Sequence, residues 1–187
     1  ILNNMSEVAP IVTKLLEFRH EGTLLDVASG FGQHAIFFAG CGFDVTALDI
    51  DALSLRDIDT ISEEKGLEIK TMQGDVKHLD QLTGTWDIIV CTFVLHFLND
   101  DEIEKAIKDI KALTNPGGLN VISAHTIEND PDESKPHMFK PGELKDRYSD
   151  WGIKYEWQGL GNSYKSIKTG EMIQRYRADI IVEKPMQ

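Results

Sequence analysis

Two acids and two glycines near the start of the chain have the types and spacing of a nucleoside-binding site. Asp26 lies in an apolar run that is followed by Gly30 and Gly32, and a second apolar run ends at Asp49. Glycine is needed where the backbone takes a positive φ angle or touches a ligand closely. The N–H groups of a helix that starts there can bind an anionic or polar group, and an acid ending the second strand can accept both ribose hydroxyls. The pattern predicts a site for a nucleoside-bearing cofactor.

The kind of cofactor is not decided by the glycines, because residues 30–35 also match the dinucleotide pattern G-x-G-x-x-A. Asp26 argues against a nicotinamide dinucleotide, since a carboxylate at the end of the first strand would repel a pyrophosphate. The same carboxylate could brace the glycine turn or meet an ammonium group. A nicotinamide-dependent oxidoreductase and a non-catalytic protein that binds the cofactor remain the alternatives to a group-transfer enzyme.

Alternating strands and helices are expected to bring these residues to one edge of a sheet. The pattern predicts helices over 8–18, 32–40, 51–64 and 99–113, strands over 23–28, 43–48, 67–73, 86–92 and 119–124, and a turn at 115–118. Such alternation predicts a parallel sheet with helices on both faces. Ligands of these sheets bind at the carboxyl ends of the strands, where residues 26–32, Asp49, Asp75 and 91–96 all fall.

The last third of the chain has a different pattern. A polar loop is predicted over 128–135, a short helix over 141–150, and strands over 151–160 and 174–184. The link between these two strands is too short for a crossover helix, so they are predicted to pair antiparallel. The predicted fold is α/β, a Rossmann-like three-layer sandwich with a seven-stranded, mostly parallel sheet whose last strand is antiparallel. One domain is expected over residues 1–187.

Several motifs give the chain, over about residues 5 to 184, a resemblance to class I S-adenosylmethionine-dependent methyltransferases. The class motifs are Asp-x-x-x-Gly-x-Gly over 26–32, the acid ending the second strand, Gly74-Asp75-Val76, and Asn-Pro-Gly-Gly over 115–118. The chain is most similar to the tellurite-resistance and thiopurine-type small methyltransferases. The stretches similar to the tellurite-resistance family are Gly42-Phe-Asp-Val-Thr-Ala-Leu-Asp49, Val94-Leu-His-Phe-Leu98 and Phe139-Lys-Pro-Gly-Glu-Leu-Lys145.

The resemblance implies S-adenosyl-L-methionine as the cofactor and assigns roles to the residues that match its motifs. The methionine part would be held by backbone around the glycine turn, the ribose by an acid, and the adenine by an apolar residue and a second acid. The implied cofactor-binding residues are Asp26, Ala28, Ser29, Gly30, Gly32, Asp49, Ile50, Asp75, Val76, Cys91 and Phe93. Asp49 would bind the ribose hydroxyls, Ile50 would pack on the adenine and Asp75 would accept its amino group.

The chain departs from the family pattern at two places. Ala28-Ser29-Gly30 stands where the family has Gly-Cys-Gly, which narrows the room for backbone approach slightly. The tellurite-type enzymes carry a His-Arg pair before the last strand, whereas residues 162–165 read Asn-Ser-Tyr-Lys here. The missing histidine puts tellurite chemistry as such in question, and both departures support the non-catalytic alternative.

The pattern assigns no catalytic residue, but it offers three candidates. His125 ends the fifth strand toward the expected acceptor cleft, His137 lies in a segment, 126–139, that could act as a lid, and Tyr164 precedes the last strand. His96 is expected to pack at the rim of the site, and Arg175 and Arg177 could reach the acceptor. The spacing of the histidines and cysteines does not predict a metal site.

Composition narrows the range of partners. The 187 residues carry a formal net charge of −12, which disfavours nucleic acids and anionic membranes as partners. No apolar run reaches the about 18 residues of a membrane span, and no signal peptide is visible. The two cysteines lack disulfide or metal-motif spacing, so a cytoplasmic location is expected. The acidic surface and the resemblance together favour a small acceptor, uncharged or cationic, that presents sulfur or another soft atom; the oligomeric state is left open.

Overall fold

A seven-stranded sheet with helices on both faces forms the body of the molecule in a computed structural model, which describes residues 8–129, 134–165 and 170–186, with the side chains of 164 and 165 excluded. Over these residues the strand order is β3-β2-β1-β4-β5-β9-β6. The main elements are α1 (Pro10–Lys14), β1 (Thr23–Val27), α2 (Gln33–Gly40), β2 (Asp44–Asp49), α3 (Ala52–Lys65), β3 (Ile69–Gln73), β4 (Trp86–Thr92), α4 (Asp100–Leu113), β5 (Thr114–His125), α5 (Glu143–Arg147), β6 (Gly152–Leu160) and β9 (Tyr176–Glu183).

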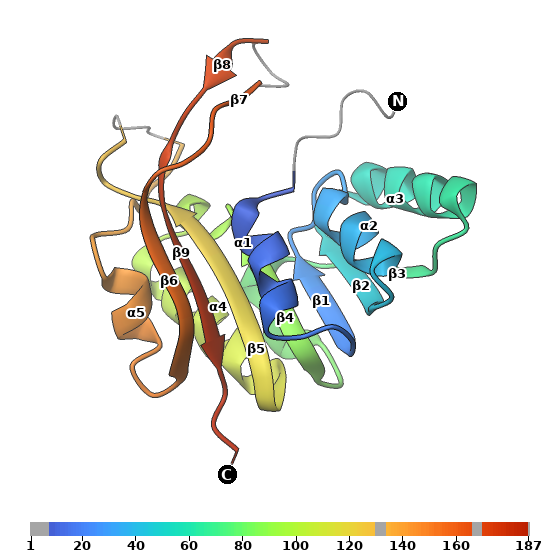
Figure 1. Ribbon diagram of the computed structural model, residues 1–187, viewed down its shortest axis with the longest axis horizontal. Coiled ribbons are helices and arrows are strands. Elements are labelled where there is room, and N and C mark those ends of the chain that lie inside the picture. Colours follow the sequence, from blue (N-terminus) through green and yellow to red (C-terminus); the bar gives the residue numbers. More distant parts are fainter. Residues whose placement is uncertain (1–7, 130–133, 166–169, 187) are drawn as a thin grey trace.

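The direction of the strands agrees with the predicted fold. β1 pairs parallel with β2 and β4, β3 pairs parallel with β2, and β5 pairs parallel with β4. β9 runs antiparallel between β5 and the edge strand β6. The predicted α/β sandwich, mostly parallel with an antiparallel last strand, is therefore confirmed. The carboxyl ends of the parallel strands meet at the top of Figure 1.

The two faces of the sheet are covered by separate helix layers (Figure 1). On one face, apolar side chains of α1, α2 and α3 pack on the sheet and form one core cluster. On the other face, α4 and α5 form a second cluster with the opposite side chains of β1, β4, β5 and β9. The central strand β4 is buried along both faces, as its continuous apolar run predicts.

Capping residues fix the helix ends that lie near the carboxyl edge. The side chain of Asp51 accepts a hydrogen bond from Leu53 N at the start of α3, where the helix was predicted to begin. Asn99 and Glu102 form a capping box at the start of α4, so that each side chain bonds the backbone N–H of the other residue. These caps hold the loops after β2 and β4 in place, and both loops border the site.

Several sequence predictions were wrong in extent. The helix predicted over 8–18 is α1 followed by a short 3-10 helix, η2 (Leu15–Glu17), and the helix predicted over 141–150 is only α5. The predicted turn at 115–118 lies inside β5, where the pairing with β4 shifts register between Trp86 and Ile88. A 3-10 helix after β3, η3 (Val76–Gln81), was not predicted.

The connection from β6 to β9 holds a small additional sheet that was not predicted. Its strands are β7 (Tyr164–Lys165) and β8 (Met172–Ile173), which pair antiparallel above the carboxyl edge (Figure 1). Residues 166–169 of this connection, and residues 130–133 of the predicted loop and lid, lie outside the described residues. The two ends of the predicted lid, 126–139, lie side by side, because Phe139 N donates to His125 O at 3.0 Å and Ile127 N donates to Phe139 O at 3.0 Å.

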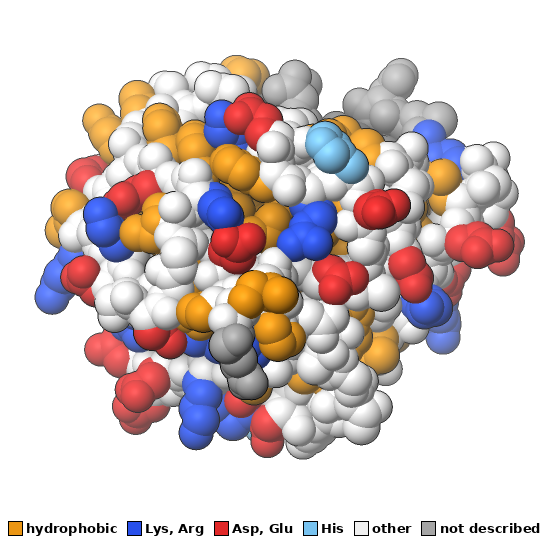
Figure 2. All heavy atoms as spheres, turned by 60° about the horizontal axis from the view of Figure 1, so that its bottom comes forward, with side chains coloured by type: hydrophobic (Ala, Val, Ile, Leu, Met, Phe, Trp, Pro, Cys, Tyr) orange, Lys and Arg blue, Asp and Glu red, His pale blue; other side chains and the backbone are white. Residues whose placement is uncertain are grey.

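Figure 2 brings forward the face at which the parallel strands have their amino ends, and this face carries acidic and basic side chains interspersed with each other. This is the surface expected of a solvated acidic protein rather than of a nucleic-acid-binding face. Among the described helices, none has both the length and the apolar character that a membrane span requires.

Candidate cofactor and acceptor site

The turn after β1 approaches a ligand mainly with its backbone. Ala28, Gly30 and Gly32 all have positive φ angles, of 58°, 53° and 76°. A Cβ atom on Gly32 would lie 2.4 Å from Cγ1 of Ile58, so packing against α3 requires glycine there. A Cβ atom on Gly30 would meet no neighbour within 4 Å, which leaves this position open to the edge of the sheet. Ala28 tolerates a conformation that suits glycine better, consistent with its place in the family motif.

Asp49 ties the glycine turn to the end of β2. Its Oδ2 accepts a hydrogen bond from Gly30 N at 2.7 Å, and its Oδ1 accepts one from Asp51 N at 2.9 Å. The residue is buried at the sheet edge, with 8% of its surface exposed. Because a carboxylate offers about four lone-pair positions, both oxygens can accept further hydrogen bonds. Asp49 therefore braces the loop and still has the acceptors that ribose hydroxyls need.

Asp26 and Ser29 present buried polar atoms that lack a partner among the described residues. Oδ2 of Asp26 and Oγ of Ser29 have no hydrogen-bond partner, and both side chains are buried. Burial raises the pKa of Asp26 to about 7, which a hydrogen bond from the backbone of Ala35 partly offsets, and the charge of Asp49 raises it further. Unsatisfied buried groups are uncommon in proteins and call for an explanation. A bound amino-acid group, whose ammonium can donate to both oxygens, fits this pair.

We expect the buried Asp26 to make the ligand-free protein less stable as the pH rises. Its folded pKa of about 7 lies above the unfolded value of 3.8, so between these values only the folded state keeps the proton. The free energy of unfolding then falls as the pH rises through this window, by up to about 4 kcal/mol at about 1.4 kcal/mol per pKa unit. Urea unfolding at pH 5 and pH 8 spans about two pH units of this window and should show a loss of about 3 kcal/mol for the wild type and not for Asp26→Asn. Equal losses in both proteins would contradict the assignment.

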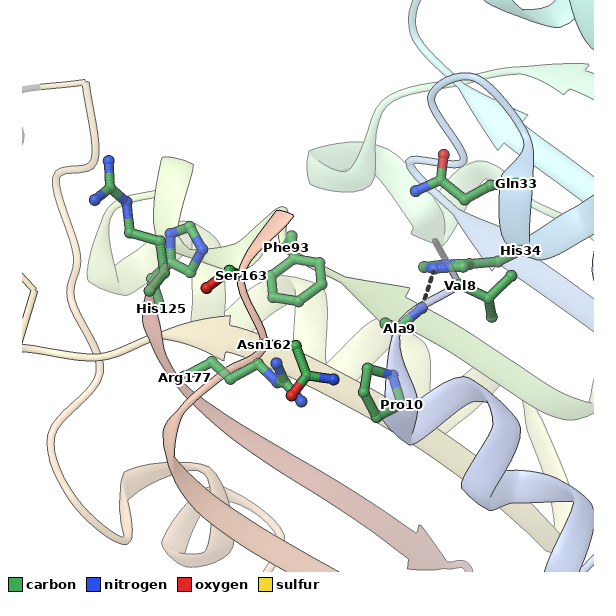
Figure 3. A pocket seen from close by; sticks show the side chains of 11 residues that line it. Val8, Ala9, Pro10, Gln33, His34, Phe93, His125, Asn162, Ser163 and Arg177 are labelled. Atoms are coloured by element: carbon green, nitrogen blue, oxygen red, sulfur yellow. Dashed lines mark hydrogen bonds between the residues drawn. The ribbon is translucent and has the colours of Figure 1, made fainter. Parts of the chain in front are cut away.

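A pocket of about 180 Å³ opens beside the glycine turn (Figure 3). It is formed by four parts of the chain: the start of α1 with the two residues before it, the first turn of α2, the ends of β4 and β5, and the connection from β6 into the start of β9. The residues that line it are Val8, Ala9, Pro10, Gln33, His34, Phe93, His125, Asn162, Ser163, Arg175 and Arg177. Of the described lining residues, the two arginines are the ones with permanent charge.

His34 lies on one wall of this pocket as a neutral imidazole. Burial lowers its pKa to about 4. Its Nε2 accepts a hydrogen bond from Ala9 N at 3.4 Å, drawn in Figure 3, and its Nδ1 lies 3.3 Å from Oγ1 of Thr92. Because Nε2 accepts, Nδ1 carries the proton and donates to Thr92. His34 therefore joins the segment before α1 to the end of β4 and closes one side of the pocket.

Arg177 is held at the opposite wall by a buried acid. Its Nε donates to Oδ2 of Asp179 at 2.9 Å and its guanidinium lies 4.7 Å from the centre of the Trp157 ring. Ser123 Oγ donates to Oδ1 of Asp179 at 2.6 Å. Burial raises the pKa of Asp179, while the charge of Arg177 and the hydrogen bond from Ser123 lower it. The guanidinium is thus fixed where it borders both the pocket and Gly161.

Some of the remaining predicted site residues lie at the carboxyl ends of the strands, and Cys91 lies in the apolar core. Ile50 is 65% exposed next to Asp49, as an adenine platform would need. Asp75 caps η3 by accepting from Lys77 N at 2.9 Å, and Val76 is buried behind it. Cys91 lies in the apolar core and does not line the pocket, and burial raises the pKa of its thiol far above the ordinary range. Their cofactor contacts stay predictions.

Of the catalytic candidates, His137 does not line the pocket, and Tyr164 has a side chain that the structure does not describe. His137 lies between two acids: its Nδ1 contacts Asp100 Oδ1 and its Nε2 lies 2.8 Å from Glu143 Oε1. Glu143 also accepts from Arg147 at 2.7 Å, so His137 belongs to an ionic cluster that joins α4 to α5. The side chain of Tyr164 lies outside the described residues. His125 and Phe93, in contrast, both line the pocket.

The sheet order, the glycine turn and the acid at the end of β2 define the fold of the class I S-adenosylmethionine-dependent methyltransferases. Residues 3–180 match the family of the tellurite resistance protein TehB. The chain therefore belongs to the TehB family, as the sequence motifs predicted. It is similar, at 29% identity over 163 residues, to a protein described as a probable S-adenosyl-L-methionine-dependent methyltransferase TehB from Haemophilus influenzae.

The chain matches only part of the length of that relative and of others. The match covers 86% of this chain and 57% of the relative, so the chain spans a little over half of the length of the curated protein it matches. The crystal structure of TehB from Haemophilus influenzae superposes with a TM-score of 0.86 at 26% identity, covering 97% of this chain and 64% of that one. A glycine/sarcosine N-methyltransferase from Halorhodospira halochloris is 27% identical over 116 residues, which are 60% of this chain and 43% of the relative.

Proposed function

We propose that this chain transfers a methyl group from S-adenosylmethionine to a small acceptor that presents a soft nucleophile. The observation that carries the proposal is the pair of unsatisfied buried atoms, Asp26 Oδ2 and Ser29 Oγ, beside a turn braced by Asp49. When bound, the cofactor supplies an activated methyl group, so the protein needs mainly to align two partners and exclude water. Asp49 would fix the ribose, Asp26 and Ser29 the amino-acid end, and Phe93 would separate this end from the pocket.

The charges in the pocket change the expected kind of acceptor. The sequence favoured an uncharged or cationic acceptor because the surface is acidic. The described lining of the pocket instead holds Arg175 and Arg177 together with the polar side chains of Asn162 and Ser163. Arginine binds carboxylates and other oxyanions with paired, charge-assisted hydrogen bonds. We therefore propose a small anionic acceptor, such as a thiol that carries a carboxylate or a soft oxyanion.

Ligand-induced stabilisation tests the cofactor assignment. S-adenosylhomocysteine is expected to raise the melting temperature, because a ligand at a hundred times its dissociation constant adds roughly 2.7 kcal/mol of stability. NADH is expected to have no effect, since its pyrophosphate would meet the carboxylate of Asp26. A melting curve that does not move at millimolar S-adenosylhomocysteine, or one that moves with NADH, would contradict the proposal.

Methyl transfer to a panel of small acceptors then separates an enzyme from a non-catalytic binding protein. The panel would pair each uncharged thiol with a thiol of the same length that ends in a carboxylate, and would include selenite and tellurite. Preference for the anionic member of each pair would support the arginine assignment. Cofactor binding without turnover of any acceptor would favour the non-catalytic alternative, which Ala28 and the residues at 162–165 already suggest.

We also propose a cytoplasmic location for the protein. The free thiols of Cys41 and Cys91 are consistent with it.

A further inference from the structure

His125 occupies a position in the pocket that methyl transfer alone does not explain. It is the last residue of β5, 8% exposed, and pairs in register with Arg177 on β9. Figure 3 shows its ring on the same side of the pocket as Phe93 and Ser163, across from His34. The ring centres of His125 and Phe93 lie 5.6 Å apart. The imidazole of His125 therefore borders both the pocket and Phe93, the residue that follows β4.

A second histidine holds His125 in this orientation. His96, from the 3-10 helix η4 (Leu95–Phe97), is 1% exposed, and its ring stacks on that of His125 with centres 4.2 Å apart and an angle of 15°. The backbone N–H of His125 donates to Nδ1 of His96 at 3.3 Å. Nδ1 of His96 is therefore the acceptor in this hydrogen bond. The hydrogen bond and the ring contact together hold His125 in its orientation.

Cationic and imidazole side chains surround His125. Among the described residues, the titratable or charged groups around it are His96 on η4, Arg175 just before β9, Arg177 on β9, and His34 across the pocket. Asp179 compensates Arg177 through a hydrogen-bonded ion pair. An imidazole that borders a pocket lined by two arginines is placed to take a proton from an anionic acceptor bound there.

We propose that His125 is a catalytic residue that removes a proton from the acceptor, and that His96 is a positioning residue for it. The inference rests on the proposed methyl transfer and names its proton acceptor. For a thiol, the S–H bond breaks, and its electron pair stays on sulfur and forms the new bond to the methyl carbon. The bond between the methyl carbon and the sulfonium breaks, leaving its pair on the cofactor sulfur. The proton stays on the imidazole of His125 until it is released to solvent.

Acceptors of graded acidity test this role directly. We would measure kcat/KM of the wild type and of His125→Gln with carboxylate-bearing thiols, from alkyl thiols that are protonated at pH 7 to an aromatic thiol that is already ionised. General-base catalysis is worth about 10²–10⁴-fold, so the variant should lose at least about a hundredfold with alkyl thiols and only a few-fold with the ionised thiol. The acidic limb of the pH profile for alkyl thiols should reflect the imidazole in the wild type, and in the variant it should move up to the pH range in which the thiol itself ionises.

Matched variants separate a proton-transfer role of His125 from a purely structural one. His20→Gln changes an exposed histidine outside the site, and it should match the wild type throughout. His96→Gln should lower kcat with little change of KM and should shift the titration of the His125 imidazole in NMR spectra. Binding of S-adenosylhomocysteine, measured by calorimetry, should be the same in all these proteins. If His125→Gln does not fold, His125→Ala assayed with added imidazole replaces it, and recovery of alkyl-thiol turnover is expected.

The outcomes distinguish this inference from the proposed function. An equal loss for alkyl and ionised thiols, no loss at all, or failure of imidazole to restore turnover would overturn the role of His125 and leave methyl transfer intact. Wild-type protein that binds S-adenosylhomocysteine and methylates only acceptors without an ionisable proton would also overturn it. Wild-type protein that does not bind S-adenosylhomocysteine would overturn the proposed function itself.

Discussion

Replacement of Asp49 by Ala is expected to weaken binding of S-adenosylhomocysteine by about one to three powers of ten. Charge-assisted hydrogen bonds are worth roughly 1.5–3 kcal/mol each, and 1.4 kcal/mol is a factor of ten in affinity. The carboxylate also accepts from Gly30 N and Asp51 N, so the variant leaves two backbone donors without their acceptor. We therefore expect Asp49→Ala to lose about 1–3 kcal/mol of stability as well.

A neighbouring acid provides the matched control. Asp51 accepts from Leu53 N at 3.0 Å and from Ser54 Oγ at 2.9 Å, both within the first turn of α3. Asp51→Ala should therefore lower the stability through the loss of a helix cap, without a change in cofactor affinity. Titration calorimetry and a urea melt on both variants compare the two effects. Wild-type affinity in Asp49→Ala together with lowered stability would show that Asp49 only braces the loop.

The sequence was sufficient for the parts of the fold that are set by local chemistry. The buried run of β4 was predicted with its observed bounds because apolar residues dominate a strand that is covered on both faces. The helices predicted to start at residues 51 and 99 do begin there, because the side chains of Asp51 and Asn99 cap them by bonding backbone only two or three residues away. By contrast, η3 was missed, since a 3-10 helix of this kind depends on Asp75 and on packing against α4 rather than on a periodic pattern.

The site was predictable on its cofactor side and much less so on its acceptor side. The glycine turn and Asp49 come from consecutive strand ends, so their meeting follows from a parallel sheet. The pocket instead combines segments that are far apart in sequence and whose approach depends on tertiary packing, as shown by the contact of His34 with Ala9. His34 could have been found from its place in the first helical turn after the glycines. The contact of His137 with Asp100 could not have been foreseen, because the two residues are distant in sequence.

Removal of the Arg177 side chain is expected to have the second large effect, through the acid that it leaves behind. Asp179 is 2% exposed, and the side chain of Arg177 is 11% exposed. Removing one partner of a buried ion pair typically costs about 3–5 kcal/mol, because the other charge stays buried without compensation. Arg177→Met should lose this stability at pH 8 and less at pH 5, since Asp179, whose pKa burial already raises, can then take up a proton. Urea unfolding at the two pH values measures both.

Arg175→Met is the control that separates binding of the acceptor from stability. Arg175 lines the same pocket and is only partly buried, and no acid is described as its ion-pair partner. Both variants should raise KM for a carboxylate-bearing thiol more than for its uncharged counterpart, whereas only Arg177→Met should unfold more easily. Adding Asp179→Asn to Arg177→Met should restore much of the lost stability, because the buried charge is then gone, and should leave KM high. An Arg177→Met protein as stable as Arg175→Met would mean that solvent, not Arg177, compensates the carboxylate of Asp179.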